Sequence, residues 1–186
     1  MKLVDLLESK KEIILVSSNK NKIKEFKEMI PQLKIENGKD LPEVQSNMNN
    51  VILYKALDAG KGYIVEDTIL EVNGIEVVDI RWKKSTLNEG DKVRWIVSLG
   101  YNDGQHISVY RGIINGKITL KKENPEAFGF DDYVIPQGTD KTLFELGSKK
   151  TEFSARKLAL ENFKNNKKVF LKKITEIKPW TGTYQH

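Results

Sequence analysis

Short apolar runs alternate with helical patterns along the first 70 or so residues. Residues 13–16 are wholly apolar, as expected of a central strand covered on both faces, and helical spacing then continues up to Pro31, which ends the helix. A short strand at 33–35, a helix at 49–60 and a strand starting at Tyr63 follow. The order strand–helix–strand–helix–strand is typical of a parallel sheet.

The middle of the chain changes pattern and indicates antiparallel strands. Apolar alternation predicts strands at 91–101 and 105–114, joined by a turn at 102–104. Asn115-Gly116 is the residue pair typical of a type I′ hairpin, so residues 117–120 are predicted to return as the partner strand. The fold class is therefore α/β, with a mixed twisted sheet and flanking helices.

The remaining segments give weaker patterns. In chain order they are a short amphipathic helix at 2–10, a strand or irregular loop at 75–82, a loop at 123–136, a short strand or turn at 142–146, a long helix at 148–162, a strand at 169–171 and a basic, peripheral tail at 172–186. Neither repeats nor a low-complexity linker interrupts the sequence, which favours one domain over residues 1–186.

Composition excludes several classes of function. The chain has no cysteine, which removes disulfides, thiolate nucleophiles and cysteine zinc sites, and His106 and His186 are too few for a zinc cluster or a serine triad. The net charge of +5 permits an anionic small molecule and falls short of a nucleic-acid-binding pattern. No apolar run reaches the roughly 18 residues of a membrane span, and acids among the first eight residues argue against a signal peptide. We expect a cytoplasmic protein.

Two adjacent acids follow the apolar start of the strand at Tyr63. Glu66 and Asp67 are placed where that strand would end, and in open α/β sheets ligands bind outside the carboxyl ends of the strands. Paired carboxylates suit capture of a divalent cation and activation of water. The alternative is a solvated turn that happens to contain two acids.

A polar loop follows the first strand directly. Ser17, Ser18 and Asn19 are good helix N-caps, and Lys22 adds a positive charge one turn later. A helix N-terminus presents N–H groups and a positive dipole end to an anion. An ordinary cap with solvated lysines would leave the same pattern, and for Asn19 and Lys22 the two interpretations remain open.

A third segment carries aromatics beside an acid. Phe128, Gly129, Phe130 and Asp131 combine ring faces that can stack on a base with a carboxylate that can accept from ring N–H groups. Loop aromatics tucked into the core are the alternative.

The order of these segments is more specific than any one of them. In sequence they are Ser17-Ser18-Asn19-x-x-Lys22, Leu41-Pro42-Glu43-Val44-Gln45, Tyr54-Lys55-Ala56, Val65-Glu66-Asp67-Thr68, Phe128-Gly129-Phe130-Asp131 and Ser154-Ala155-Arg156. This succession resembles the Ham1/inosine triphosphate pyrophosphatase family, which hydrolyses non-standard purine nucleoside triphosphates. The resemblance extends over about residues 13–163.

The resemblance implies a set of roles. The residues of the 17–22 loop would hold the triphosphate, with Asn19 and Lys22 as direct ligands and Lys22 also neutralising charge in catalysis. Glu66 and Asp67 would bind Mg²⁺, and Asp67 would act as general base on water attacking between the α and β phosphates. The products would be a nucleoside monophosphate and pyrophosphate.

The resemblance also implies a base pocket and an architecture. Thr68 would lie against the nucleotide, Phe128 would stack on the base, and Lys150 and Arg156 would contact the nucleotide and the base edge. Gly129, Phe130 and Asp131 would complete the pocket. Family members have two lobes around a central nucleotide cleft and commonly form homodimers, and both features are expected here, with no nucleic-acid or membrane partner.

Several positions depart from the family pattern. Ala155 stands where the family has a histidine that helps to recognise the purine six-position oxygen, and losing such a contact typically costs about 1–3 kcal/mol. Asn50 stands where the family usually has a metal-binding glutamate, and it could ligate Mg²⁺ through its carbonyl, with Glu43 as another acid able to complete the site. The loops before Phe128 and after the acidic pair also differ.

These departures favour a pyrophosphatase with altered base choice. Two alternatives remain. One is a nucleotide-binding protein of the same fold that has lost catalysis, which Asn50 would explain. The other is a Maf-type pyrophosphatase acting on pyrimidine or modified bases, against which the Phe-Gly-Phe-Asp and Ser-Ala-Arg segments argue.

Overall fold

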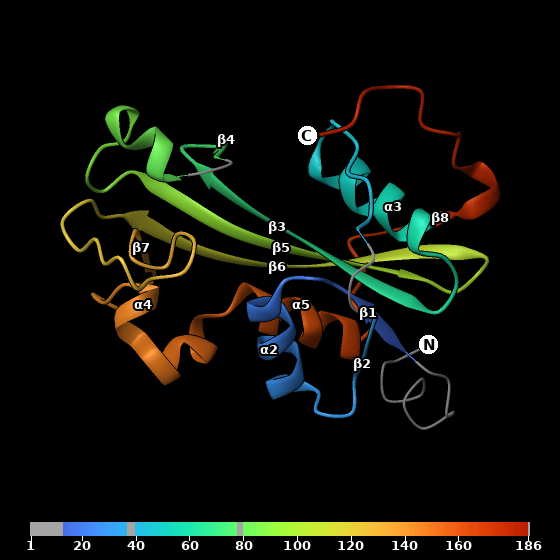
Figure 1. Ribbon diagram of the computed structural model, residues 1–186, viewed down its shortest axis with the longest axis horizontal. Helices are drawn as coiled ribbons and strands as arrows, with labels where there is room; N and C mark the ends of the chain where they lie inside the picture. The colour runs from blue at the N-terminus through green and yellow to red at the C-terminus, as the bar shows by residue number, and fades with distance from the viewer. Residues whose placement is uncertain (1–12, 37–39, 78–79, 186) are drawn as a thin grey trace. The chain divides into compact units, whose positions relative to one another are not determined.

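The computed structural model describes residues 13–36, 40–77 and 80–185, apart from the side chains of residues 81–83. The helix predicted at 2–10 and His186 therefore lie outside the described residues. The described strands form one eight-stranded sheet in the order β2-β1-β3-β5-β6-β7, with β4 added to β3 and β8 added to β6 (Figure 1). The predicted class, a mixed α/β sheet with flanking helices, is confirmed.

The chain divides into two compact units. Unit 1 comprises residues 1–67, 98–111 and 159–186, and unit 2 comprises residues 68–97 and 112–158. The boundary falls within β3, between Asp67 and Thr68. The described part of the chain contains no helix that is both long and apolar enough to span a membrane.

Unit 1 begins with the alternation that the sequence predicts. Its elements are β1 (Ile14–Val16), α2 (Lys20–Met29), β2 (Lys34–Glu36), α3 (Met48–Ala59) and the start of β3 (Tyr63–Val72). β1 pairs in parallel with both β2 and β3, which places β1 between them. The parallel arrangement follows because each helix carries the chain back across the sheet before the next strand begins.

The core of unit 1 explains why α3 lies against the sheet. Ile52 and Ala56 of α3 are wholly buried and cluster with Val65 of β3 and with Ile107 and Val109. The apolar spacing on α3 thus meets the apolar alternation on the strands. The helix ends at Gly60, whose φ of 92° is readily adopted only by glycine.

Two long strands run through both units. β5 (Lys92–Asn102) and β6 (His106–Ile118) are joined by the predicted turn, in which Gly104 has φ 93° and Asp103 Oδ1 accepts from the backbone N–H groups of Gln105 and His106. β8 (Phe170–Lys173) pairs antiparallel with β6, so the predicted strand at 169–171 is confirmed.

The hairpin predicted at Asn115-Gly116 is wrong. β6 continues straight through these residues, and its partner is β7 (Val134–Pro136), with Gly116 opposite Pro136. A Cβ added to Gly116 would lie 2.4 Å from the carbonyl oxygen of Ile135. The glycine permits close approach of two strands rather than a turn, and the pair Asn-Gly alone cannot distinguish these uses.

The segment predicted as a strand or turn at 142–146 is helical. α4 (Leu143–Leu146) begins at Thr142, whose side chain accepts from the N–H of Glu145 while the Glu145 carboxylate accepts from the N–H of Thr142. This capping box stabilises a helical start and overrides the short β-like pattern. The ambiguous stretch after Gly74 resolves into β4 (Ile75–Glu76) and the 3₁₀ segment η1 (Ile80–Thr86).

The long helix predicted at 148–162 is divided in two. A 3₁₀ segment, η2 (Gly147–Phe153), is followed by α5 (Ala155–Lys164), and Ser154 between them has extended backbone dihedrals. The Ser154 hydroxyl accepts from the backbone N–H of Lys157 and so begins α5. The break matters for function because it lies directly before Ala155 and Arg156.

Candidate functional site

An ion pair joins the polar loop to the acidic strand within unit 1. Lys22 Nζ lies 3.1 Å from a carboxylate oxygen of Glu66, whose side chain is only 2% exposed. Lys22 is on α2, which Asn19 begins by accepting from the backbone N–H groups of Asn21 and Lys22. Two residues predicted from separate motifs, Lys22 and Glu66, are therefore in contact.

The prediction that Glu66 and Asp67 stand at the end of their strand is wrong, because β3 continues to Val72 and both acids lie in its middle. They are directed to opposite faces of β3. Successive side chains of a strand alternate between faces, so Asp67 shares a face with Val65, which packs in the core cluster containing α3 residues. The charges acting on Asp67 agree with this placement. Lys55 and Glu43 affect it more strongly than Glu66 and Lys22 do.

Burial raises the pKa of the Asp67 carboxyl to about 6, from an ordinary value of 3.8. This pKa is the net result, in which burial has the largest effect, Lys55 and Lys22 lower the pKa, and the carboxylates of Glu43 and Glu66 raise it. A partly buried carboxyl that ionises near neutral pH is suited to accept a proton from water.

The two residues whose charges act most strongly on Asp67, Lys55 and Glu43, were not part of the predicted catalytic set. Lys55 Nζ lies 2.8 Å from Glu43 Oε1, with the lysine side chain 14% exposed. Asp67 is thus flanked by two lysine–carboxylate pairs, Lys22 with Glu66 and Lys55 with Glu43. The Leu-Pro-Glu-Val-Gln segment contains Glu43 and the Tyr-Lys-Ala segment contains Lys55. The sequence alone does not show that these two side chains form an ion pair.

Asn50 lies in the first turn of α3, where its side chain has a structural task. Its backbone N–H is capped by Asn47 Oδ1 at 3.0 Å, and its side-chain Nδ2 donates to Ser46 Oγ at 2.9 Å. The carbonyl end of the same amide is the only part suited to a metal. Ser17 and Ser18 precede α2, and the Ser17 hydroxyl accepts from the backbone N–H of Asn19 at 3.2 Å.

Unit 2 holds the residues predicted to recognise the base. Arg156, at the start of α5, donates from its guanidinium to Thr68 Oγ1 at 3.0 Å and is 6% exposed. Lys150 Nζ in η2 lies 2.7 Å from Asp131 Oδ2, and both side chains are largely buried. These contacts join residues that are 88 and 19 positions apart in the sequence.

An indole ring missed by the sequence reasoning links these groups. Trp95 is 2% exposed, and its ring centroid lies 5.6 Å from Lys150 Nζ and 5.9 Å from the Arg156 guanidinium carbon. Phe130 meets the same ring edge-on, with centroids 5.8 Å apart. Cations over an indole face are attracted by its π electrons. Trp95 could not be distinguished in the sequence from an ordinary core residue, because it lies in a strand with apolar alternation.

The loop before β7 leaves one aromatic exposed. Phe128 is 52% exposed, and Gly129 beside it has φ 59°. Phe128 lies two residues before Phe130, which packs on Trp95, and its exposed ring is available for stacking. Ala155 has no exposed surface at all. The space expected from the missing histidine is therefore occupied by neighbouring protein atoms.

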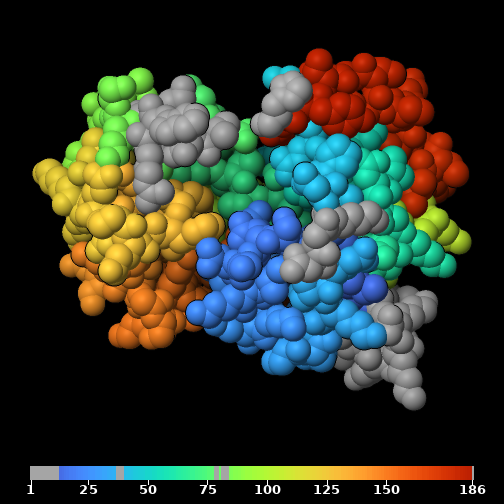
Figure 2. Space-filling model, in the orientation of Figure 1, coloured from blue at the N-terminus to red at the C-terminus, as the bar shows by residue number. Residues whose placement is uncertain are grey.

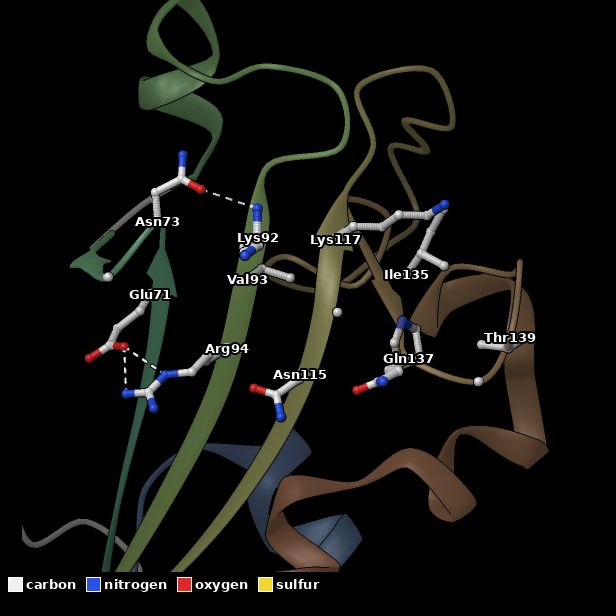
Figure 3. A pocket seen from close by; sticks show the side chains of 14 residues that line it. Glu71, Asn73, Lys92, Val93, Arg94, Asn115, Lys117, Ile135, Gln137 and Thr139 are labelled. Carbon is white, nitrogen blue, oxygen red and sulfur yellow. Dashed lines mark hydrogen bonds and ion pairs between the residues drawn. The ribbon is translucent and has the colours of Figure 1, made fainter.

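A large hollow in unit 2 lies elsewhere. It has a volume of about 960 Å³ and is lined by residues of β3, β5, β6 and β7, among them Glu71, Arg94, Asn115 and Lys117. Figure 3 shows the ion pair between Arg94 and Glu71 in it, with an Arg94 nitrogen 2.7 Å from a Glu71 oxygen. None of the predicted site residues lines this hollow, so its size does not identify it as the nucleotide site.

Oxygen donors are the groups here that could hold a metal ion. Within residues 13–36, 40–77 and 80–185, no three histidine, cysteine, aspartate or glutamate side chains lie close enough to form a complete metal site. One or two carboxylates suffice when the remaining ligands are water and phosphate oxygens, as is usual for Mg²⁺. Asp67 with Glu43 would supply such a set, whereas Glu66, predicted as a metal ligand, is directed to the other face of β3 and pairs with Lys22.

The fold is that of an α/β protein. Its clustered carboxylates and lysines are suited to acid–base chemistry and to binding an anionic ligand. Comparison with known proteins gives the family. The family model described as "Ham1 family" matches residues 13–78 and 81–166, and the chain belongs to this family.

Several individual proteins are similar over most of their length. The chain is 30% identical over 182 residues to a "dITP/XTP pyrophosphatase" of Methanopyrus kandleri, covering 83% of this chain and 97% of that protein. It is 27% identical over 187 residues to an "Inosine triphosphate pyrophosphatase" of Scheffersomyces stipitis, covering 82% and 96%. The solved structure of the Staphylococcus aureus Ham1 protein has a TM-score of 0.63 at 22% identity, covering 82% of this chain and 96% of that chain, which shows a shared fold.

Proposed function

We propose that this chain is a Mg²⁺-dependent nucleoside triphosphate pyrophosphohydrolase that acts on non-standard purine nucleotides. The observation that carries the proposal is Asp67, a partly buried carboxyl with a pKa of about 6 on which the charges of two lysine–carboxylate pairs act. The names of the relatives in Methanopyrus kandleri and Scheffersomyces stipitis support the reaction and the purine class. The products are a nucleoside monophosphate and pyrophosphate.

The groups of unit 1 act on the phosphates and the water. Above pH 6 the Asp67 carboxylate is ionised and accepts the proton of the attacking water. Lys22 and Lys55 bring positive charge to the phosphates, which matters because the leaving pyrophosphate carries negative charge. Asn19 uses its carbonyl oxygen to cap α2 and would offer its amide N–H to a phosphate oxygen.

The carboxylates of unit 1 fit Mg²⁺. Asp67 would hold the ion with Glu43, and phosphate oxygens and water would complete the coordination. When bound, Mg²⁺ neutralises phosphate charge and makes a bound water more acidic. Glu43 and Asn50 are the two candidates for the second protein ligand, and Glu43 has the advantage of a full negative charge.

The residues of unit 2 would recognise the base. Phe128 would stack on the ring system, and Arg156 and the Lys150–Asp131 pair would provide charged donors and an acceptor for its edge. Ala155 offers no polar atom where the family has a histidine. We therefore expect discrimination by the six-position oxygen to be weaker by about 10- to 100-fold.

A panel of nucleotides tests reaction and specificity together. The full chain is supplied with Mg²⁺ and with ITP, XTP, dITP, ATP, GTP, CTP, UTP and amino-bearing purine triphosphates, and release of pyrophosphate and of monophosphate is measured. Release of both products from at least one purine triphosphate is expected. Release of orthophosphate instead would contradict the site of attack, and strict preference for ITP and XTP would contradict altered base choice.

A binding protein without catalysis is the second candidate, favoured by Asn50 in place of a carboxylate. It predicts nucleotide binding without turnover, unaffected by Asp67→Asn. Two further variants separate the metal ligands. Glu43→Gln should raise the Mg²⁺ concentration needed for half-maximal rate by about 10-fold or more, whereas Asn50→Ala should change it little if Glu43 is the ligand.

A further inference from the structure

The C-terminal segment lies outside the family match, which ends at residue 166, yet it is bound to unit 1. After β8 the chain forms a short 3₁₀ segment, η3 (Ile174–Glu176), and continues without a further helix or named strand to Gln185. We call residues 174–185 the strap. Its residues lie beside α3 and the segment before it, as Figures 1 and 2 show in red beside cyan. The sequence predicts a peripheral tail, and the contacts below show what holds this segment to unit 1.

The strap pairs with the stretch that carries Glu43. Tyr184 forms an antiparallel bridge with Val44. The backbone N–H of Gln45 donates to the carbonyl of Thr183 at 2.9 Å, and the N–H of Gln185 donates to the carbonyl of Glu43 at 2.8 Å. Side-chain bonds reinforce the pairing, with Gln185 Nε2 donating to the Val44 carbonyl at 3.0 Å.

The strap is also fixed to α3. The Tyr54 and Trp180 rings meet edge-on with centroids 5.3 Å apart, and the Tyr54 hydroxyl donates to the Lys178 carbonyl at 2.7 Å. Trp180 Nε1 donates to the Thr183 carbonyl at 3.0 Å, which folds the strap back on itself. Gly182 permits this, because a Cβ there would lie 2.6 Å from the indole.

The ion pair between Glu43 and Lys55 therefore lies next to the residues that the strap contacts. Glu43 gives its backbone carbonyl to Gln185, and Lys55 directly follows Tyr54 on α3. The Glu43 stretch has no helix of its own, and the bridge at Val44 is its only strand pairing among the described residues. Without the strap, holding the Glu43 carboxylate in place would cost the conformational entropy of a loop.

We propose that the strap is a positioning element that holds Glu43 against Lys55 and beside Asp67 for the reaction. The proposal rests on the proposed function and adds Trp180, Thr183 and Gln185 to the residues on which it depends. These residues act through Glu43 and do not touch the nucleotide. A catalytic group displaced by about 1 Å can lose on the order of 100-fold in rate, so a distant support can matter strongly.

The test compares Trp180→Ala, Trp180→Phe and Thr181→Ala, the last an exposed residue of the same segment that serves as the matched control. Three quantities are measured on the full chain: hydrogen exchange of the Gln45 amide, the rise in thermal midpoint on adding Mg²⁺ alone, and kcat with KM for the preferred nucleotide. Circular dichroism verifies that each variant is folded.

For Trp180→Ala we expect Gln45 to exchange at least about 10-fold faster, the Mg²⁺-induced midpoint shift to shrink, and kcat to fall about 10-fold with KM changed less than 2-fold. Trp180→Phe keeps the ring and should give a smaller loss, and Thr181→Ala should give none. If Trp180→Ala does not fold, Trp180→Phe decides by the same three quantities.

A double variant identifies the route of the effect. Because the strap acts through Glu43, Trp180→Ala should cost little further kcat in a Glu43→Gln background, whereas independent effects would add. The proposal is overturned if the effects of Trp180→Ala and Glu43→Gln on kcat are fully additive. It is also overturned if Trp180→Ala speeds exchange of the Gln45 amide but leaves kcat and the Mg²⁺-induced midpoint shift unchanged. If the wild-type chain releases no pyrophosphate, the proposed function fails, and the Mg²⁺-induced shift in the same variants still decides whether the strap positions Glu43.

Discussion

Replacing Asp67 with asparagine should abolish turnover and, unusually for a catalytic residue, make the metal-free protein more stable. The pKa of this carboxyl rises from 3.8 to about 6 on folding because it is buried among other carboxylates. At about 1.4 kcal/mol per pKa unit, ionised Asp67 lowers the free energy of unfolding by about 3 kcal/mol. Asparagine has the same shape and removes the charge.

The sign and the pH window follow from linkage. The unfolded carboxyl ionises near pH 3.8 and the folded one near pH 6, so the destabilisation is absent below 3.8, grows between these values and is complete above 6. Asp67→Asn should therefore raise the free energy of unfolding by about 1 kcal/mol at pH 4.5 and by up to about 3 kcal/mol at pH 8.

Urea unfolding at pH 4.5 and pH 8, in the presence of a chelator, measures both values. The control is Asp140→Asn, an exposed aspartate on the surface of unit 2, whose effect should be within about 0.5 kcal/mol at both pH values. A loss of stability at pH 8, or a gain that does not depend on pH, would refute the burial argument. Near-normal turnover by Asp67→Asn would show that the chemistry has been placed wrongly.

Three further changes probe unit 2. Lys150→Ala removes the ion pair with Asp131, and steady-state kinetics should show KM raised about 10-fold with kcat nearly unchanged; a fall in kcat alone would contradict a binding role. Trp95→Leu removes the ring beneath Lys150 and Arg156 and should raise KM by several-fold and lower stability by about 2–4 kcal/mol, whereas Trp95→Phe should do less of both in the same kinetic and urea measurements. Gly116→Ala sets a Cβ 2.4 Å from the Ile135 carbonyl oxygen and should lower the thermal midpoint by an amount equivalent to about 1–3 kcal/mol. The control is the neighbouring Asn115→Ala. An equal loss of stability in that variant would show that the effect is not specific to the close strand contact.

The sequence predicted well wherever a pattern is local. The parallel strands β1, β2 and β3 and the helices between them follow from apolar spacing, Pro31 and Gly60, and the family follows from the order of its short motifs. Local patterns failed where one signal serves two structures. Asn115-Gly116 fits a turn and a close strand contact equally, and only the position of β7 decides between them.

The candidate site divides in the same way. The acids, the lysine of the polar loop and the Phe-Gly-Phe-Asp segment could be named from the sequence because each has a recognisable chemical character. The contacts between these residues could not be predicted, because contacts such as that of Arg156 with Thr68 join residues 88 positions apart. Trp95 gave no sign of its role, because an aromatic residue in an apolar strand usually serves the core.

By itself, the sequence determined the kind of protein: an α/β chain of the Ham1 family with two carboxylates on a strand and a polar loop before a helix. Only the tertiary structure decided the surroundings of those groups. Glu66 and Asp67 are directed to opposite faces of β3. Glu66 pairs with Lys22, and Lys55 is the lysine that acts most strongly on Asp67. The C-terminal strap pairs with the stretch that carries Glu43. Burial and long-range pairing depend on where distant segments meet, and local residue patterns do not encode that directly.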